Sequence, residues 1–255
     1  MTKHAGSLGF RKGMVIASLN VNSLPLHKDE LSAFINEKGI HMLALNETKL
    51  DKKTPKQLMN IKNYKIERED RNKHGGGVAV YIRESINHSR REDIPLNGLE
   101  LVCIEIKPVK ASPFIVVAWY RPPSDPVATF EKLEQVLQFF ERENKEIILL
   151  GDTNCDLLAV EQEVSLNVEH NNTKRITELY QLYGLTQLIS EPTRETCHTS
   201  TLIDHIAVSA ASNIVESGVL KVSLSDHYMI FCVRKYRGAL KGQHKKNYYP
   251  SNEGL

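Results

Sequence analysis

Carboxylate, amide and imidazole side chains recur in this sequence next to short apolar runs. Two amides follow the run 14–19, an acid follows 41–45, and an acid with an amide follows 146–150. A further acid lies within the run 203–208, and an acid with a histidine directly precedes 228–233. Polar side chains at strand ends can converge in one cleft without being buried in a core. The positions are Asn20, Asn22, Glu47, Asp152, Asn154, Asp204, Asp226 and His227.

The residue types in this set suit the hydrolysis of a phosphodiester. Carboxylate and amide oxygens are the ligands preferred by a hard cation such as Mg²⁺, which usually takes few protein carboxylates beside water and substrate phosphate. Glu47, supported by Asn20, fits that task. A phosphodiester is itself anionic, so the site must also neutralise charge and position a water. Asp152 and His227 are suited to these remaining tasks.

Each of these residues also has a purely structural explanation. A single aspartate at a strand end is more often a turn former or a helix cap than a catalyst. Asn20 and Asn22 could simply terminate a strand, and His227 could be a core histidine beside a capping aspartate. What favours chemistry is the whole set of matched residues, in the order in which they occur along the chain.

Short runs rich in Val and Ile predict buried strands, which must position these side chains. The predicted strands are 14–19, 41–45, 77–82, 101–106, 114–119, 146–150, 203–208 and 228–233. Apolar residues at helical spacing predict one helix before Gly39, one at 130–140 and one at 176–183. For the last helix, Thr173 is the predicted N-cap and Gly184 the predicted C′ residue. Some strands follow each other directly while helices join others, which is typical of packed sheets with helices outside.

The composition is that of an ordinary globular chain, with 255 residues, 41% of them hydrophobic and 25% charged. Lys and Arg total 33 against 31 for Asp and Glu, and a net charge of +2 is too small to indicate a nucleic-acid protein by bulk electrostatics. The four cysteines are widely spaced, which indicates neither a zinc site nor a secreted disulfide framework and fits a reducing compartment. No apolar run approaches the ~20 residues of a membrane-spanning helix. We expect a polar segment at 1–12, one domain at 13–234 and a basic tail or linker at 235–255.

Taken in order, short motifs around these residues resemble those of the endonuclease/exonuclease/phosphatase superfamily. They are LNVNSL (19–24), LNETKL (45–50), GGGVAVYI (75–82), WYRPPS (119–124), GDTN (151–154), TLIDHI (201–206) and SDHYMI (225–230). The Gly triplet, the YRPPS stretch and the EPTR segment at 191–194 are similar, more narrowly, to the apurinic-type endonuclease domain of LINE-type, non-LTR retrotransposon polyproteins. The resemblance covers residues 14–234, and the motifs are specific as a set rather than singly.

This resemblance implies an α/β (α+β) fold, a four-layer α/β sandwich of two facing mixed β-sheets flanked by helices, with a cleft at one edge. The residue matching Glu47 would hold the metal, Mg²⁺ or alternatively Mn²⁺, with Asn20 close by. Asp226 matches a further acid near the metal, and Asn22 would line the same pocket.

The resemblance also implies a division of catalytic work. Asp152 would orient or deprotonate the attacking water, and Asn154 would help to position that water and the phosphate. Tyr120 matches a tyrosine that contacts the scissile phosphate, as a donor or as a phenolate. Asp204 would fix the imidazole of His227, whose cationic form would stabilise the phosphate charge.

Contacts to DNA are expected from residues in or beside predicted loops. The candidates are Arg68, Arg71, Lys73, Arg121, Arg194 and Thr201, although a surface arginine is usually only solvated. The segment 193–200 matches in position a hairpin loop that related enzymes use to probe the duplex, or it is an inert connection. The triplet 75–77 favours a flexible turn before a strand over a phosphate cradle. Thr153 stands where the family usually has a bulky apolar residue, and we expect it to pack behind the site with a modest effect.

The function implied by the resemblance is that of a Mg-dependent endonuclease, which nicks one strand of double-stranded DNA and leaves 3′-hydroxyl and 5′-phosphate ends. In the retrotransposon setting that hydroxyl primes reverse transcription, so a reverse transcriptase domain of a parent polyprotein is an expected partner. We expect a monomeric domain without membrane association, nuclear or both cytoplasmic and nuclear, and not secreted. Two alternatives are a phosphoesterase of the same fold acting on a lipid or inositol phosphate, and a domesticated, inactive DNA-binding module.

Overall fold

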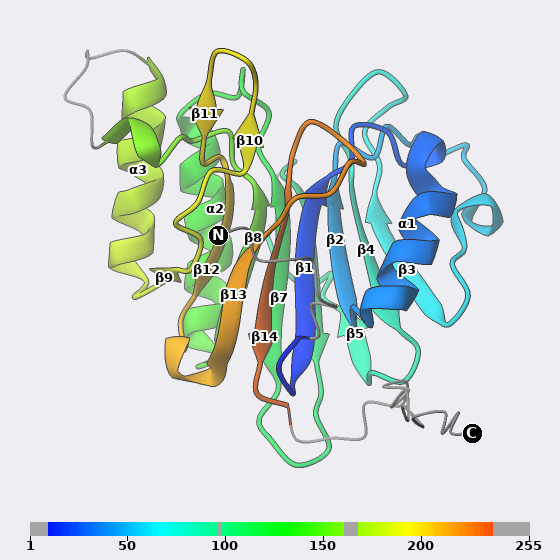
Figure 1. Ribbon diagram of the computed structural model, residues 1–255. Helices are drawn as coiled ribbons and strands as arrows, with labels where there is room; N and C mark the ends of the chain where they lie inside the picture. The colour runs from blue at the N-terminus through cyan, green and yellow to red at the C-terminus, as the bar shows by residue number, and fades with distance from the viewer. Residues whose placement is uncertain (1–9, 96–97, 161–167, 237–255) are drawn as a thin grey trace, which may run out of the picture.

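The computed structural model describes residues 10–95, 98–160 and 168–236, and these contain two six-stranded sheets stacked face to face (Figure 1). Sheet I has the order β13 (Ile214–Leu220), β14 (Met229–Arg234), β1 (Met14–Asn20), β2 (Met42–Asn46), β4 (Val78–Arg83), β3 (Tyr64–Glu69). Sheet II has the order β5 (His88–Arg90), β6 (Glu100–Ile106), β7 (Phe114–Tyr120), β8 (Glu146–Asp152), β12 (Asp204–Val208), β9 (Thr186–Gln187). A small hairpin is formed by β10 (Arg194–Glu195) and β11 (Ser200–Thr201).

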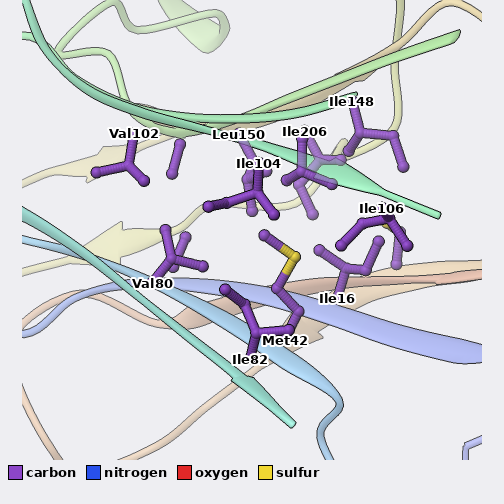
Figure 2. Packing of buried hydrophobic residues seen from close by; sticks show 14 of the residues in the cluster. Ile16, Met42, Val80, Ile82, Val102, Ile104, Ile106, Ile148, Leu150 and Ile206 are labelled. Carbon is purple, nitrogen blue, oxygen red and sulfur yellow. The ribbon is translucent and has the colours of Figure 1, made fainter. Parts of the chain in front are cut away.

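Helices cover the outer face of each sheet, which gives the four layers that the sequence predicts. Helix α1 (Leu24–Lys38) packs on sheet I, while α2 (Ala128–Arg142) and α3 (Val168–Leu182) pack on sheet II. The inner faces of the two sheets meet in a core of mainly aliphatic side chains, many of them β-branched, and part of it is drawn in Figure 2. Because both faces of the central strands are buried, these strands are continuous apolar runs rather than alternating ones.

Two strand–helix–strand units determine which strand ends meet. Strands β1 and β2 are parallel and joined by α1, and β7 and β8 are parallel and joined by α2, whereas the other neighbours are antiparallel. The carboxyl ends of the parallel strands therefore lie at one end of the sandwich, where the antiparallel strands β12 and β14 begin. The β10–β11 hairpin lies at this same end, uppermost in Figure 1. This topology brings distant polar segments together.

All eight predicted strands are present, shifted by no more than a residue or two at their ends. Six of the described strands were not predicted. Of these, β5, β9, β10 and β11 have only two or three residues each, β3 has four charged residues among its six, and β13 is only half buried. The predicted N-cap of α3 is wrong: Thr173 lies inside the helix, because the polar residues before it continue the helix to Val168. Gly184 is the C′ residue as predicted, since it adopts a left-handed φ of 58° and Leu185 N–H donates to Tyr180 O at 2.7 Å. Among the described helices, none is both long and apolar enough to span a membrane.

Candidate active site

A polar cavity of about 190 Å³ opens at the end of the sandwich where the parallel strands finish. Its lining is Asn20, Asn22, Glu47, Pro123, Asp152, Asn154, Arg194, Asp226 and His227. The structure thus brings together seven of the eight strand-end residues that the sequence singled out. The eighth, Asp204, does not line the cavity but is hydrogen-bonded to His227, which does. Tyr120 reaches the same site through a hydrogen bond of 2.6 Å to Glu47.

Three buried residues, which we call the buried half, lie at the floor of the cavity: Asp152 and His227 line it, and Asp204 is bonded to His227 behind it. Each is no more than 5% exposed. His227 Nδ1 and Asp204 Oδ2 are 2.8 Å apart, so Nδ1–H donates to the carboxylate and the imidazole is held in one orientation. Asp152 comes from β8 and pairs in register with Asp204 of β12, which places two acids side by side. Asn20 Nδ2 donates to Asp152 Oδ2 at 2.8 Å from the opposite sheet.

Burial and mutual charge perturb the protonation of this buried half. Burial, reinforced by the neighbouring Asp204, raises the pKa of Asp152 to about 7. For His227 burial acts against the charged form, but the Asp204 carboxylate and its hydrogen bond outweigh it and raise the pKa of the imidazole to about 9. At neutral pH the pair can therefore present a base and a cation within one small volume, which is what general-base catalysis beside an anionic phosphate requires.

Glu47 and Asn22 line a more open part of the cavity, and Lys49 lies beside them; we call these three residues the open half. Glu47 is 25% exposed, and Lys49 Nζ lies 3.9 Å from its Oε2. Lys49 also donates to the side-chain oxygen of Asn22. Burial and the hydrogen bond to Glu47 raise the pKa of Tyr120, which favours the donor role over the phenolate role.

The open half depends on an unusual backbone path. Asn22, Glu47 and Lys49 have φ of 46°, 52° and 53°, in the left-handed region that non-glycine residues rarely adopt. Backbone hydrogen bonds from Ser23 N to Glu47 O (2.8 Å) and from Lys49 N to Gly76 O (3.0 Å) hold the turn in place. Such over-determined, strained residues gather at functional sites.

Two glycines allow these segments to approach. A Cβ on Gly77 would lie 2.5 Å from Thr48 Oγ1, so a glycine is needed at this position, where the turn before β4 packs against the turn after β2. A Cβ on Gly151, the first residue of GDTN, would lie 1.9 Å from Trp119 O. The Gly triplet 75–77 therefore forms the turn before strand β4, as the sequence analysis favoured.

A divalent cation fits the open half better than the buried half. Asp152, Asp204 and His227 do place possible ligand atoms within 4.8 Å of one another. Asp152 accepts hydrogen bonds from Asn20 and from Asn154 N–H, and His227 Nδ1 is bonded to Asp204 Oδ2, whereas Asp204 Oδ1 has no partner among the described residues. The raised pKa of the imidazole favours its protonated form, which offers no lone pair to a metal. Glu47 lines the cavity, and its Oε2 accepts no hydrogen bond from the described residues. Glu47, with the amide oxygen of Asn20, provides the oxygen donors that hard cations prefer.

Asn46 is a site residue that the sequence analysis missed. It is fully buried at the end of β2, its Oδ1 accepts from Asp152 N at 2.9 Å, and its Nδ2 donates to Trp119 O at 3.3 Å. It therefore links sheet I to the two parallel strands of sheet II that frame the catalytic aspartate candidate. The available signal was an amide at a strand end, the same signal that marked Asn20.

The loop after β8 is fixed by hydrogen bonds on the side facing away from the cavity. Thr153 is buried as predicted and donates to Ile203 O at 3.1 Å. The buried His205 lies 2.9 Å from Tyr180 OH and 3.0 Å from Cys155 O, so it ties α3 to this loop. Asn154 faces the cavity, and its Nδ2 donates to Arg121 O at 2.8 Å.

Several predicted DNA contacts need correction. The prediction for Arg121 is wrong: its side chain is 0% exposed, lies over the Phe130 ring and donates to Asp125 O at 2.6 Å. Arg68 does not lie in a loop but in β3, where its side chain is 9% exposed and faces Asp70. Both side chains are therefore largely shielded from solvent.

The remaining candidates lie nearer the surface. Arg71 forms an ion pair of 2.7 Å with Glu100, and Lys73 lies 3.5 Å from Asp51. Thr201 is part of the β10–β11 hairpin, where its hydroxyl donates to Arg194 O at 3.4 Å. Arg194 itself lines the cavity and pairs with Asp226 at 2.7 Å.

Comparisons with known proteins agree with this architecture. Among solved structures, the chain is similar to the endonuclease domain of TRAS1, a telomere-specific non-LTR retrotransposon, with a TM-score of 0.70 and 14% identity over 88% of this chain and 99% of that one. It is also similar to the Xenopus laevis APE2 catalytic domain (TM-score 0.69, 15% identity, 90% and 95% covered). An AP endonuclease from Archaeoglobus fulgidus gives a TM-score of 0.62 at 18% identity, with 87% and 99% covered. At these identities the likeness shows the fold.

No curated protein matches the sequence significantly. The model of the Endonuclease/Exonuclease/phosphatase family matches residues 17–227, which include every residue of the two halves of the cavity. The predicted superfamily resemblance is confirmed, and the chain belongs to the endonuclease/exonuclease/phosphatase family.

Proposed function

We propose that this protein is a metal-dependent endonuclease that hydrolyses a phosphodiester of double-stranded DNA and nicks one strand. The observation that carries the proposal is the pairing, within one cavity, of a raised-pKa aspartate with an aspartate-bound histidine beside an accessible glutamate. A base, a fixed cation and a metal-binding carboxylate are the parts that water attack on a phosphodiester needs.

The residues of the chain divide the work as follows. Asp152, held by Asn20 and by Asn154 N–H at 3.0 Å, takes a proton from the attacking water. Protonated His227, oriented by Asp204, stabilises the developing negative charge on the phosphate. Asn154 positions the phosphate. In-line attack breaks the bond from phosphorus to the 3′ oxygen, leaving a 3′-hydroxyl and a 5′-phosphate.

The open half supplies the metal function. Glu47 with Asn20 would hold Mg²⁺, or Mn²⁺ in its place, which when bound lowers the charge repulsion of the phosphate and acts as a Lewis acid there. Tyr120 donates to Glu47 and so fixes the carboxylate. Lys49, on the other side, adds a positive charge near Asn22.

The biological setting is part of the same proposal. The likeness to a retrotransposon endonuclease domain supports target-site nicking, in which the new 3′-hydroxyl would prime a reverse transcriptase. Nuclear action as a monomeric domain would suit that role. A polymerase extension assay on the nicked product tests it, because only a 3′-hydroxyl end is extended.

The decisive experiment is nicking of supercoiled plasmid by the purified protein. We expect relaxation in Mg²⁺, none in chelator, and none by the Asp152→Ala variant. Asp93→Ala is the matched control, because Asp93 pairs with Arg91, which also binds Glu143, and Asp93 does not line the cavity. Equal activity of wild type and Asp152→Ala, or hydrolysis of sphingomyelin or an inositol phosphate with none of DNA, would contradict the proposal. Binding of DNA without cleavage would instead indicate an inactive binding module.

A further inference from the structure

The β10–β11 hairpin beside the cavity is attached to the segment that carries the buried half by backbone hydrogen bonds. Tyr228 N donates to Thr193 O at 2.7 Å, and Arg194 forms a β-bridge with His227. Thr193 is fully buried, and its Oγ1 accepts from the backbone N–H groups of Ile203 (3.2 Å) and Asp204 (3.1 Å). The start of the side chain of Arg194 therefore has a fixed position relative to the Asp204–His227 pair.

The guanidinium of Arg194 uses only one of its edges. Its Nε donates to Asp226 Oδ2 at 2.8 Å, and its Nη2 lies 2.7 Å from the same oxygen in the ion pair. Nη1 makes no hydrogen bond to any described residue, although Arg194 lines the cavity. A guanidinium carries five N–H groups in a planar fork, so the edge formed by Nη1 and Nη2 is available to an anion.

Stability does not account for this pair. The side chains are 43% and 45% exposed, and an ion pair so accessible to solvent contributes little to folding. The pair instead fixes a position: it holds the long, flexible side chain of Arg194 at the rim of the cavity, next to the proposed phosphate site. Arginine binds backbone phosphates through two parallel N–H bonds, and pre-ordering its side chain lowers the entropy lost on binding.

We propose that Asp226 is the anchor of Arg194 rather than a ligand of the catalytic metal, and that the pair forms a subsite for a nucleic-acid backbone phosphate next to the scissile one. This inference rests on the proposed nuclease function and assigns to Asp226 a role different from the one that the family resemblance implies. In this arrangement Asp226 acts through Arg194, so it is a positioning residue.

The two roles for Asp226 predict different behaviour towards metal. If Asp226 anchors Arg194, the affinity of the DNA-free protein for Mn²⁺, measured by electron paramagnetic resonance, stays within about twofold in Asp226→Asn. The Glu47→Gln variant is the positive control and should bind Mn²⁺ at least about tenfold more weakly. A tenfold loss in Asp226→Asn would overturn the anchor role, whatever the effect on cleavage.

A double-mutant cycle tests whether Asp226 acts through Arg194. We expect Arg194→Gln to lower kcat/KM about tenfold, mainly through KM, and to reduce the slope of log affinity against log salt by about 1, measured on a short duplex in chelator. Asp226→Asn should change kcat/KM about fivefold when Arg194 is present and less than about twofold in the Arg194→Gln background. Effects that simply multiply would overturn the coupling, and an unchanged salt slope would overturn the phosphate contact.

Controls separate this inference from the proposed function and from misfolding. Arg175→Gln breaks a comparable exposed pair, Arg175 with Glu134 at 3.0 Å between α3 and α2, and should change neither kcat/KM nor the salt slope. Arg194→Lys keeps the charge and should restore the salt slope, though not the full KM, because it lacks the planar fork. If wild-type protein cuts no DNA, both proposals fail; if it cuts and Asp226→Asn loses Mn²⁺, only the anchor role fails.

Discussion

The two halves of the cavity differ in how they are solvated. Asp152, Asp204 and His227 are almost fully buried and bonded to protein groups, whereas Glu47 and Lys49 are about a quarter exposed. In the low-dielectric interior, charges act strongly on each other and shift pKa values, as they do for Asp152 and His227. In the open half, water keeps interactions weaker and lets ions exchange. In the proposed mechanism, the site therefore pairs a preorganised base and cation with an accessible edge that would bind the metal.

The largest effect is expected from the buried half. Replacing His227 by Gln removes the fixed cation, and nicking should fall by about a thousandfold without recovery at high Mg²⁺, measured as initial rate on plasmid. Because Asp204 would be left buried without its partner, the protein should also be less stable. The double variant His227→Gln/Asp204→Asn removes that unpaired charge; it should melt closer to wild type and still be inactive. Recovery of activity in the double variant would show that the cation is dispensable.

A change in the open half should behave differently. Glu47→Gln is expected to lower nicking about a hundredfold at low Mg²⁺, and raising Mg²⁺ should recover much of it because the variant binds the ion more weakly. The measurement is the rate as a function of Mg²⁺ concentration. A loss that is the same at all Mg²⁺ concentrations would mean that Glu47 is not a metal ligand. The open half would then not be the metal-binding part of the site.

The pH dependence of cleavage should report the buried half. In the proposed mechanism Asp152 is the base, so activity should be lost as pH falls through about 7, where its carboxylate gains a proton. In the same mechanism His227 is the cation, so activity should also be lost as pH rises through about 9, where it loses its proton. The profile of kcat should be bell-shaped, with about a tenfold loss per pH unit outside these limits. A flat profile from pH 6 to 10 would contradict both roles.

The smallest effect is expected at the residue that joins the halves. Asn46→Ala leaves Asp152 N–H without its acceptor in a buried site, which should lower the free energy of unfolding by about 1–3 kcal/mol in urea titrations. Activity should drop by about tenfold or less, since no group that meets the phosphate is lost. Asn36→Ala, at an exposed position on α1, is the control and should change stability by less than about 0.5 kcal/mol. Equal effects at the two positions would show that the link between the sheets is unimportant.

The sequence was most informative where the residue types of a segment directly reflect its place in the fold. The eight buried strands were predictable because sandwiched strands must be apolar on both faces, whereas β13, with a serine and a glutamate among its apolar residues, was not. The polar residues at strand ends were recognisable because their order matches the family. Arg121 shows the limit: nothing in YRPPS reveals that its guanidinium stacks on Phe130 while only its carbonyl serves the site.

By itself, the sequence determined the central strands, because these follow from the pattern of apolar residues. It also determined the family and the set of candidate polar residues, because these follow from residue types and their order along the chain. Only the tertiary structure decided which of them became buried partners. Asn20 meets Asp152 across 132 positions, and Arg194 meets Asp226 across 32. Desolvation, pKa and the choice of partner depend on such contacts between sheets and loops, because an ionisable group responds to what surrounds it in space rather than to its neighbours along the chain.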